Sequence, residues 1–242
     1  MTHRSLPVAC AAFALPLALG PAQAESYPLR AVVFGSLDAA PSSFAANGVK
    51  VELEGGRTGP VILASAGFGR RFETVLCTCG SRAYTARLAR YTVAAAAVGG
   101  YQWTGAWGVA ALYAGPEASM EALTDGLGVA ILPARIGLRL HGEVWAHPSP
   151  DTLVNGTLIA GTARGDVWSR LALGYRIWGA YLGPETSLYA DQTGYAKWSL
   201  GLHASDVPLW RYRLRVSAGV QFETGRERPS PYISLTAWAT AQ

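Results

Sequence analysis

The chain has 242 residues, of which 50% are hydrophobic, 15% are charged and 28 are glycine. This balance is too apolar for a disordered chain and too rich in glycine for a helical bundle, so β-strands are the expected secondary structure. A formal net charge of +4 could suggest nucleic acid as a partner, but the basic residues are scattered along the chain and form no run longer than the pair Arg70-Arg71. We therefore exclude a nucleic-acid-binding protein.

The first residues have the order of a secretory signal peptide. A basic start, an apolar stretch and a small-residue cleavage site follow one another at His3-Arg4, residues 6–20 and Ala22-Gln23-Ala24. We expect cleavage after Ala24, so that residues 1–24 are an export signal and residues 25–242 form the mature protein.

The mature part has the length of one large β domain. Removing 24 of the 242 residues leaves 218, and no linker or low-complexity tract divides them. After the signal no segment approaches the roughly 18 apolar residues that span a bilayer as a helix. The nearest, at residues 94–97, is short, so any passage through a membrane has to use strands.

Alternation of apolar and polar residues is the main evidence for the fold, because side chains on a strand point to its two faces in turn. Over residues 212–223 one face is apolar, and the other carries Arg213, Arg215, Ser217, Gly219, Gln221 and Glu223. The same period of two occurs over residues 49–54, 135–144 and 170–177. It predicts a transmembrane β-barrel with an apolar outer face and a polar lumen.

A soluble β-sandwich is the alternative, since its strands also alternate. Its polar face would look out to water and would carry many Lys, Glu and Asp residues. This chain has two lysines, Lys50 and Lys197, which favours the barrel.

The segments predict an all-β, antiparallel up-and-down transmembrane barrel of about twelve strands. They lie near residues 31–38, 44–54, 60–72, 85–102, 106–118, 133–146, 152–163, 167–178, 179–191, 194–204, 211–222 and 231–239. If the N-terminus starts in the periplasm, the mostly short connections are periplasmic. The opposite, extracellular side receives the loops that hold Cys77 and Cys79 and residues 120–132, 164–166, 191–194 and 224–230. Long extracellular loops and short periplasmic turns are typical of outer-membrane barrels.

Aromatic residues cluster near the predicted strand ends, where amphipathic rings would lie at the headgroup level of the bilayer. They are Tyr101, Trp103, Trp107, Trp168, Trp178, Trp198, Trp210 and Tyr212. We expect two aromatic belts, and hence the outer membrane as the location and its lipid or lipopolysaccharide as a partner.

The predicted mature part holds two cysteines, Cys77 and Cys79, in a predicted loop. A metal site there lacks a third and a fourth ligand, because no histidine lies nearby in sequence. We expect either a local disulfide clip or two loop thiols.

No catalytic, cofactor-binding or metal residue is predicted. The histidines after the signal are His141 and His203, expected in the lumen, and His147, expected in a periplasmic turn. A lumen histidine beside a glutamate is more often a member of a polar network than a base. Asp166, Asp191 and Glu185 fall near predicted strand ends on different loops and define no glycosidase pair.

A weak internal repeat leads to a family resemblance. Residues 100–117 and 174–185 each read as strand, tight turn and strand with a Gly-Pro-Glu sequence in the second strand. With residues 33–38 and 217–222, these segments resemble the cellulose biosynthesis protein BcsS family, over most of the mature chain. The resemblance implies a barrel-like exported protein with a role in making, exporting or anchoring cellulose, and with cellulose or other cellulose-synthesis components as partners.

Three functions compete at this stage. The first is a non-enzymatic outer-membrane component of cellulose production, accessory or surface-anchoring, because Arg139, Trp145, Arg176 and Arg213 are predicted to fill much of a narrow lumen. The second is a passive channel or structural barrel unrelated to cellulose, since fold does not fix function. The third is a lipid A or phospholipid hydrolase with a Ser or His site on the barrel rim.

Overall fold

The computed structural model describes residues 29–79 and 82–241. The expected signal peptide, residues 1–24, lies outside them. The described part contains thirteen strands: β1 (Arg30–Ala39), β2 (Ser43–Glu52), β3 (Gly59–Cys79), β4 (Arg82–Gly105), β5 (Gly108–Thr124), β6 (Val129–Ile131), β7 (Arg135–Ala146), β8 (Thr152–Gly161), β9 (Asp166–Ile177), β10 (Ala180–Ala190), β11 (Ala196–Leu209), β12 (Tyr212–Glu223) and β13 (Ser230–Ala241). Among these residues there is no helix long and apolar enough to cross a bilayer.

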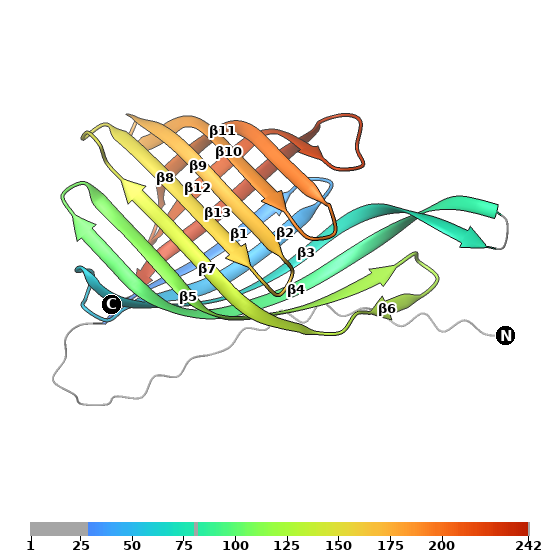
Figure 1. Cartoon of the computed structure of the whole chain (residues 1–242). Coiled ribbons are helices and arrows are strands. Elements are labelled where there is room, and N and C mark those ends of the chain that lie inside the picture. The colour runs from blue at the N-terminus through green and yellow to red at the C-terminus, as the bar shows by residue number, and fades with distance from the viewer. Residues whose placement is uncertain (1–28, 80–81, 242) are drawn as a thin grey trace.

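Twelve of the strands close into an antiparallel barrel (Figure 1). Each strand pairs with its neighbour in sequence, β5 pairs with β7, and β13 pairs with β1 from Ala31 to Ala39. Closure leaves the barrel wall without an edge, which removes the unpaired backbone groups that no lipid could satisfy. The short strand β6 lies outside the wall and pairs only with the end of β5. The predicted twelve-stranded barrel is confirmed.

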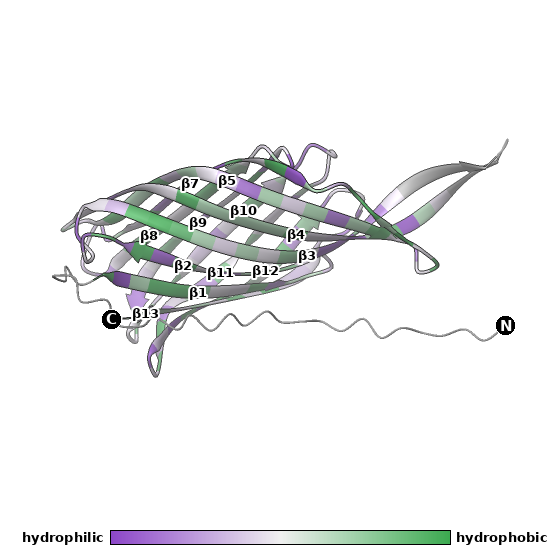
Figure 2. Cartoon of the chain, turned by 90° about the horizontal axis from the view of Figure 1, so that it is seen from below, coloured by the Kyte–Doolittle hydropathy of each residue, from purple (hydrophilic) through white to green (hydrophobic). Residues whose placement is uncertain are grey.

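The two faces of the wall follow the alternation in the sequence. On β5, Leu112 and Met120 are 56% and 47% exposed on the outside, whereas Tyr113 and Glu117 are 1% and 6% exposed on the inside. β12 and β7 repeat this arrangement, with Val216 and Leu138 outside and Arg215 and His141 inside. The outer surface carries the bands of apolar residues that Figure 2 shows along the strands. The predicted orientation of the faces is confirmed.

The two ends of the barrel differ, and we name them by what they carry. The termini end holds Arg30 and Ala241, the first residue of β1 and the last of β13. The hairpin end carries β3 and β4, which continue beyond the other strands as a projecting hairpin (Figure 1). The β9–β10 and β11–β12 connections at the termini end are two residues long, at 178–179 and 210–211.

The projecting hairpin corrects one prediction. Cys77 and Cys79 were expected in a loop, but β3 runs through both and ends at Cys79. The alternation of apolar and polar residues ends near residue 70, because charged residues then occur on both faces of β3, at Arg70, Arg71 and Glu73. Backbone pairing nevertheless continues from Arg71↔Arg90 to Cys79↔Arg82. A strand that extends beyond the lipid still needs a pairing partner, but it does not need an apolar face. The predicted loop 120–132 is likewise partly strand, formed by the end of β5 and by β6.

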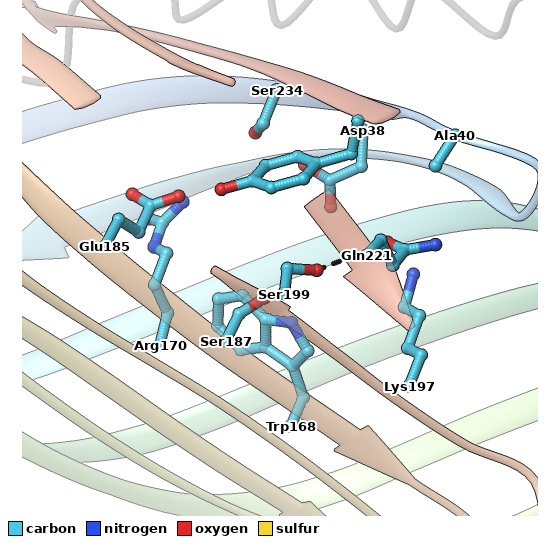
Figure 3. Close-up of a pocket in the computed structure, with 11 residues that line it drawn as sticks. Asp38, Ala40, Trp168, Arg170, Glu185, Ser187, Lys197, Ser199, Gln221 and Ser234 are labelled. Carbon is cyan, nitrogen blue, oxygen red and sulfur yellow. Dashed lines mark hydrogen bonds between the residues drawn. The ribbon is translucent and has the colours of Figure 1, made fainter. Parts of the chain in front are cut away.

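Aromatic side chains form a belt near each end. At the hairpin end Phe68 stacks on Tyr91, and Trp198 stacks on Phe222 with ring centroids 4.1 Å apart. At the termini end the exposed aromatics are Tyr101, Trp103, Trp107, Tyr175, Trp178 and Trp210. Tyr91 and Tyr101 lie ten positions apart on β4, which matches the length of a strand that crosses the apolar layer. The prediction for Trp168 is wrong, because its side chain points into the lumen (Figure 3).

Two glycines of the repeated hairpins are required by close approach of neighbouring strands. A Cβ atom on Gly100 would lie 2.0 Å from the carbonyl oxygen of Leu112, and one on Gly183 would lie 2.0 Å from that of Leu173. Backbone atoms cannot move away from such a contact without breaking the ladder between the strands. The glycine pattern of the repeat is therefore a condition for the strand spacing of the barrel.

Candidate functional site: the barrel lumen

The lumen is the candidate site because the inner face gathers most of the polar groups that the fold buries. Its buried side chains include Glu52, Arg71, Gln102, Glu117, Glu121, His141, Asn155, Glu185, His203, Arg215 and Gln221. Each comes from a strand position that alternates with an apolar residue facing outward. Burial of this many polar groups is tolerated only where they pair with one another.

At the termini end the lumen is crossed by an aromatic pair. Trp145 of β7 and Trp238 of β13 meet edge to face, with ring centroids 5.6 Å apart and an interplanar angle of 68°. Five strands separate β7 from β13 in either direction around the barrel, so these rings come from opposite walls. The guanidinium of Arg215 lies 6.0 Å from the Trp145 ring centroid. We name Trp145 and Trp238 the tryptophan bridge.

At the hairpin end an ion pair crosses the lumen. Arg71 of β3 donates a 2.5 Å hydrogen bond to Asp191, the residue that follows β10. β3 and β10 are also opposite walls, separated by five strands either way. Arg71 donates a further bond to Thr193 at 3.0 Å, and its guanidinium lies 4.2 Å from the ring centroid of Tyr195. We name the contact between Arg71 and Asp191 the arginine latch.

The arginine latch belongs to a larger ionic network. Glu73 bridges Arg71 and Arg90 at 2.6 and 2.8 Å, and Arg90 reaches Glu121 at 2.9 Å. Arg164 then links Glu121 to Asp191, at 3.4 and 3.6 Å. Burial by itself raises the pKa of the Asp191 carboxyl, but hydrogen bonds from Thr193 and Arg71 outweigh it and hold that pKa below its ordinary value. Asp191 is therefore ionised at neutral pH and keeps the latch charged.

Further contacts cross the lumen between the tryptophan bridge and the arginine latch. Lys50 of β2 reaches Glu143 of β7 at 2.6 Å, and the Tyr113 hydroxyl donates to the same carboxylate at 2.7 Å. On the other side Arg215 of β12 donates to Asn155 of β8 at 2.8 Å. In both pairs three strands of the shorter arc lie between the partners. The barrel is thus cross-braced by side chains through its interior.

A polar pocket lies beside these contacts (Figure 3). It lies against the β9–β13 wall and is lined by Asp38, Ala40, Trp168, Arg170, Glu185, Ser187, Lys197, Ser199, Gln221, Tyr232 and Ser234. Its volume of about 30 Å³ is room for about two water molecules. Arg170 Nε and the Tyr232 hydroxyl are buried without a hydrogen-bond partner among the described residues, so they are the groups that such water would satisfy.

His203 and Ser205 form a contact that has the elements of a nucleophile and a base. Ser205 Oγ lies 2.7 Å from His203 Nδ1, and His203 Nε2 lies 3.1 Å from the Leu173 carbonyl. The carbonyl only accepts, so Nε2 carries the proton and Nδ1 accepts from the serine hydroxyl. However, Ser205 is 0% exposed, His203 is 3% exposed, and Arg215 Nε donates to Ser205 Oγ at 2.7 Å. This arrangement holds Arg215 in place and offers a substrate no path to the hydroxyl.

The other histidines lie where the sequence placed them. His141 faces the lumen, 9% exposed, with its ring 5.2 Å from that of Tyr113. His147 follows β7 in the turn at the termini end, and its Nδ1 lies 3.2 Å from the Thr152 carbonyl.

The predicted positions of the carboxylates need one correction. Asp166 and Asp191 lie at strand ends and meet through the Tyr189 hydroxyl, at 3.5 and 3.1 Å. Glu185 was expected near a strand end but lies in the middle of β10, 4% exposed, and accepts from Ser217 at 3.1 Å. β10 pairs with β11 through Pro184 without a break, whereas its pairing with β9 is interrupted at residues 183–184.

The latch residues were not recognised as a site from the sequence. Arg71 and Asp191 are 120 positions apart, and no local pattern links them. Within the part of the chain that the structure describes, no group of three or more His, Cys, Asp or Glu side chains is arranged to hold a metal ion.

Comparison with known protein families decides the identity of the chain. The model of the family described as cellulose biosynthesis protein BcsS matches residues 32–241. The chain belongs to this family. The BcsS-family match covers all twelve strands of the wall, so the barrel is an outer-membrane protein related to cellulose biosynthesis. No curated protein matches the chain.

Solved structures of other membrane barrels are similar to this BcsS-family protein at low sequence identity and with TM-scores below 0.5. The KdgM porin is 9% identical with a TM-score of 0.45, over 87% of this chain and 99% of that one. The translocator domain of the autotransporter NalP from Neisseria meningitidis is 12% identical with a TM-score of 0.46, over 87% and 88%. The transport unit of the autotransporter AIDA-I from Escherichia coli is 9% identical with a TM-score of 0.45, over 92% and 93%. These likenesses concern the fold alone.

Proposed function

We propose that this protein is a closed, non-enzymatic barrel that serves cellulose production as an accessory or surface-anchoring component, and that it is not the pore through which the glucan leaves. The supporting observation is that two contacts span the lumen between opposite walls, the tryptophan bridge at the termini end and the arginine latch at the hairpin end. A glucan chain needs a continuous passage, and each of these contacts lies across it.

The proposal includes how the chain reaches its place. Residues 1–24 are removed on export, and the termini end faces the periplasm. The hairpin end, with the projecting β3–β4 strands, then faces outward, where it is available to cellulose or to other components of its synthesis. The short two-residue turns at the termini end agree with the short periplasmic turns of outer-membrane barrels.

Gene deletion tests the link to cellulose. The gene is deleted in its native host under conditions where the cellulose synthase is active, and cell-surface cellulose is measured by dye binding and as acid-resistant glucan. We expect less surface-attached cellulose or weaker cell attachment. Unchanged cellulose and unchanged attachment would reject the role.

A channel unrelated to cellulose is the second candidate, favoured by the polar character of the lumen. Planar-bilayer recording of the purified full chain separates the two. The closed barrel predicts no steady conductance, whereas a steady ohmic conductance at neutral pH would support the channel.

Catalysis by the barrel is tested through its histidines. The triple substitution His141→Ala, His147→Ala and His203→Ala should leave cellulose output near normal as long as the barrel folds. A loss of cellulose with normal amounts of folded protein would instead support a catalytic role.

A further inference from the structure

Arg70 and Arg71 are neighbours in sequence on opposite faces of β3. Arg71 points inward, is 7% exposed, and pairs with Glu73 and Asp191. Arg70 points outward, is exposed, and has no carboxylate of the described residues within ion-pair distance. The network of the lumen therefore neutralises one arginine and leaves the other free for an external anion.

A second arginine joins Arg70 on the same outer face. Arg87 of β4 is exposed, also has no carboxylate partner among the described residues, and lies 4.2 Å from the ring centroid of Phe72. Arg70 lies 5.0 Å from that centroid. Both guanidinium groups therefore rest on one aromatic ring, and their separation cannot exceed the sum of these two distances. We name Arg70, Phe72 and Arg87 the arginine clamp.

Stacking on Phe72 prepares these arginines to bind. A guanidinium over an aromatic ring is attracted by the ring face, which limits the conformations of a long side chain while its N–H groups stay available at the ring edge. The exposed Thr74 faces Arg87 across the strand pair and adds a hydroxyl to the same surface. The two guanidinium groups and the Thr74 hydroxyl can all donate hydrogen bonds to an anion.

The position of the arginine clamp relative to the membrane identifies the anion. Phe68 and Tyr91, which form the aromatic belt of the hairpin end, lie directly below it, and Arg70 faces Tyr91 across the strands. Arg70 and Phe72 follow Phe68 by two and four positions on β3, about 7 and 13 Å along the strand at roughly 3.3 Å per residue. Since aromatic belts lie at the headgroup level, the clamp lies at the level of lipid phosphates.

We propose that the arginine clamp is a binding site for a phosphate group of lipopolysaccharide in the outer leaflet. Guanidinium groups bind phosphate oxygens in pairs of parallel hydrogen bonds, and such charge-assisted bonds are stronger than neutral ones. Close to the apolar layer these charges are also less screened than in bulk water. The site goes beyond the proposed role in cellulose production and rests on the orientation proposed above, in which the hairpin end lies in the leaflet that carries this glycolipid.

Binding of lipid A to the purified full chain in detergent tests the site. Native mass spectrometry is run with lipid A that carries both phosphates, with its dephosphorylated form, and with phosphatidylglycerol. We expect tight binding of the phosphorylated lipid A alone. The double substitution Arg70→Ala and Arg87→Ala should weaken this binding about tenfold or more, because bonds between charged groups are lost. Equal binding of dephosphorylated lipid A, or preferential binding of phosphatidylglycerol, would overturn the proposal.

Matched variants separate the clamp from general electrostatic attraction. Arg228→Ala removes an exposed arginine from the β12–β13 connection at the same end and should leave binding unchanged; an equal loss there would overturn the site. Phe72→Leu keeps both arginines and removes the ring, and it should weaken binding by a smaller factor. If the double substitution reduces the amount of heat-modifiable, folded barrel, the single Arg87→Gln variant carries the test, and unchanged binding in it would reject the clamp.

Discussion

Trp145 of β7 and Trp238 of β13 face each other edge to face across the lumen, 5.6 Å between ring centroids, although five strands separate them on either side. Tryptophan side chains on a barrel are usually considered as membrane anchors, but these two are turned inward. Together they place apolar surface across the lumen at the termini end. The pair therefore spans the lumen separately from the ionic network at the other end.

Opening the barrel requires changes at both ends, and this is the first prediction. In planar-bilayer recordings we expect Trp145→Ala with Trp238→Ala to give little conductance, because the arginine latch still closes the hairpin end. Adding Arg71→Ala should produce a steady ohmic current. Trp145→Phe with Arg71→Ala is the control, since a second ring preserves most of the obstruction. A large current from the tryptophan substitutions alone would contradict a second closure.

The arginine latch should respond to acid. Because the pKa of Asp191 is lowered in the folded protein, its ionised form stabilises the latch above the ordinary aspartate pKa of about 3.9, and this stabilisation is lost as pH falls through the lower folded pKa. The protection factors of residues 191–195 in hydrogen–deuterium exchange should therefore stay high at pH 5 and fall only below about pH 4. In Asp191→Asn the same protection factors should be low at every pH. Equal exchange in both proteins at pH 7 would exclude the latch.

The faces of β12 predict opposite tolerance to charge. Val216 is 39% exposed on the outer face, and an arginine near the bilayer midplane costs about 2–4 kcal/mol. Val216→Arg and Leu214→Arg should reduce the heat-modifiable, folded fraction strongly. Arg213→Leu should have little effect, since Arg213 lies at the rim, half exposed, with Asp206 at 3.7 Å. Similar folded fractions in all three variants would mean that the faces are wrongly assigned.

The cross-brace between Lys50 and Glu143 should show in the free energy of unfolding. Lys50→Met leaves the Glu143 carboxylate with the Tyr113 hydroxyl as its remaining hydrogen-bond donor. Losing a charge-assisted bond of this kind costs about 1.5–3 kcal/mol. Adding Glu143→Gln should recover part of that cost, because the unpaired charge is gone. Urea unfolding in micelles, followed by tryptophan fluorescence, measures both values, and no recovery in the double variant would argue against the pair.

The barrel wall was predictable from the sequence because each strand that crosses the lipid needs an apolar outer face, and this need appears as alternation within the strand itself. Leu138, Leu140 and Leu171 alternate with polar residues regardless of which strands lie beside them. The alternation of apolar and polar residues therefore predicted the number of strands and the orientation of their faces. The alternation stops where a strand leaves the lipid, which is why the continuation of β3 to Cys79 was expected as a loop.

The contacts inside the lumen were not predictable by the same argument. Which inward side chains meet depends on the diameter and shear of the closed barrel, and neither is encoded in a single strand. Arg71 could be assigned to the inner face but not to Asp191 on the opposite wall. Trp168 was expected in an aromatic belt because of its position near a strand end, although it precedes Arg170 by two positions and so shares the face that alternation turns into the lumen.

The pairing of β1 with β13 has a consequence for how the protein is made. It joins Ala31 to Ala241 and Ala39 to Ile233, so the wall is closed by pairing between its first and last strands. A chain that stops before β13 leaves β1 and β12 as long unpaired edges, which pair readily with other chains. We therefore expect a truncated product that stops before β13 to accumulate as periplasmic aggregate or to be degraded, and never to reach the membrane as a smaller barrel. Pairing between β1 and β13 makes folding of the whole wall conditional on synthesis of both strands.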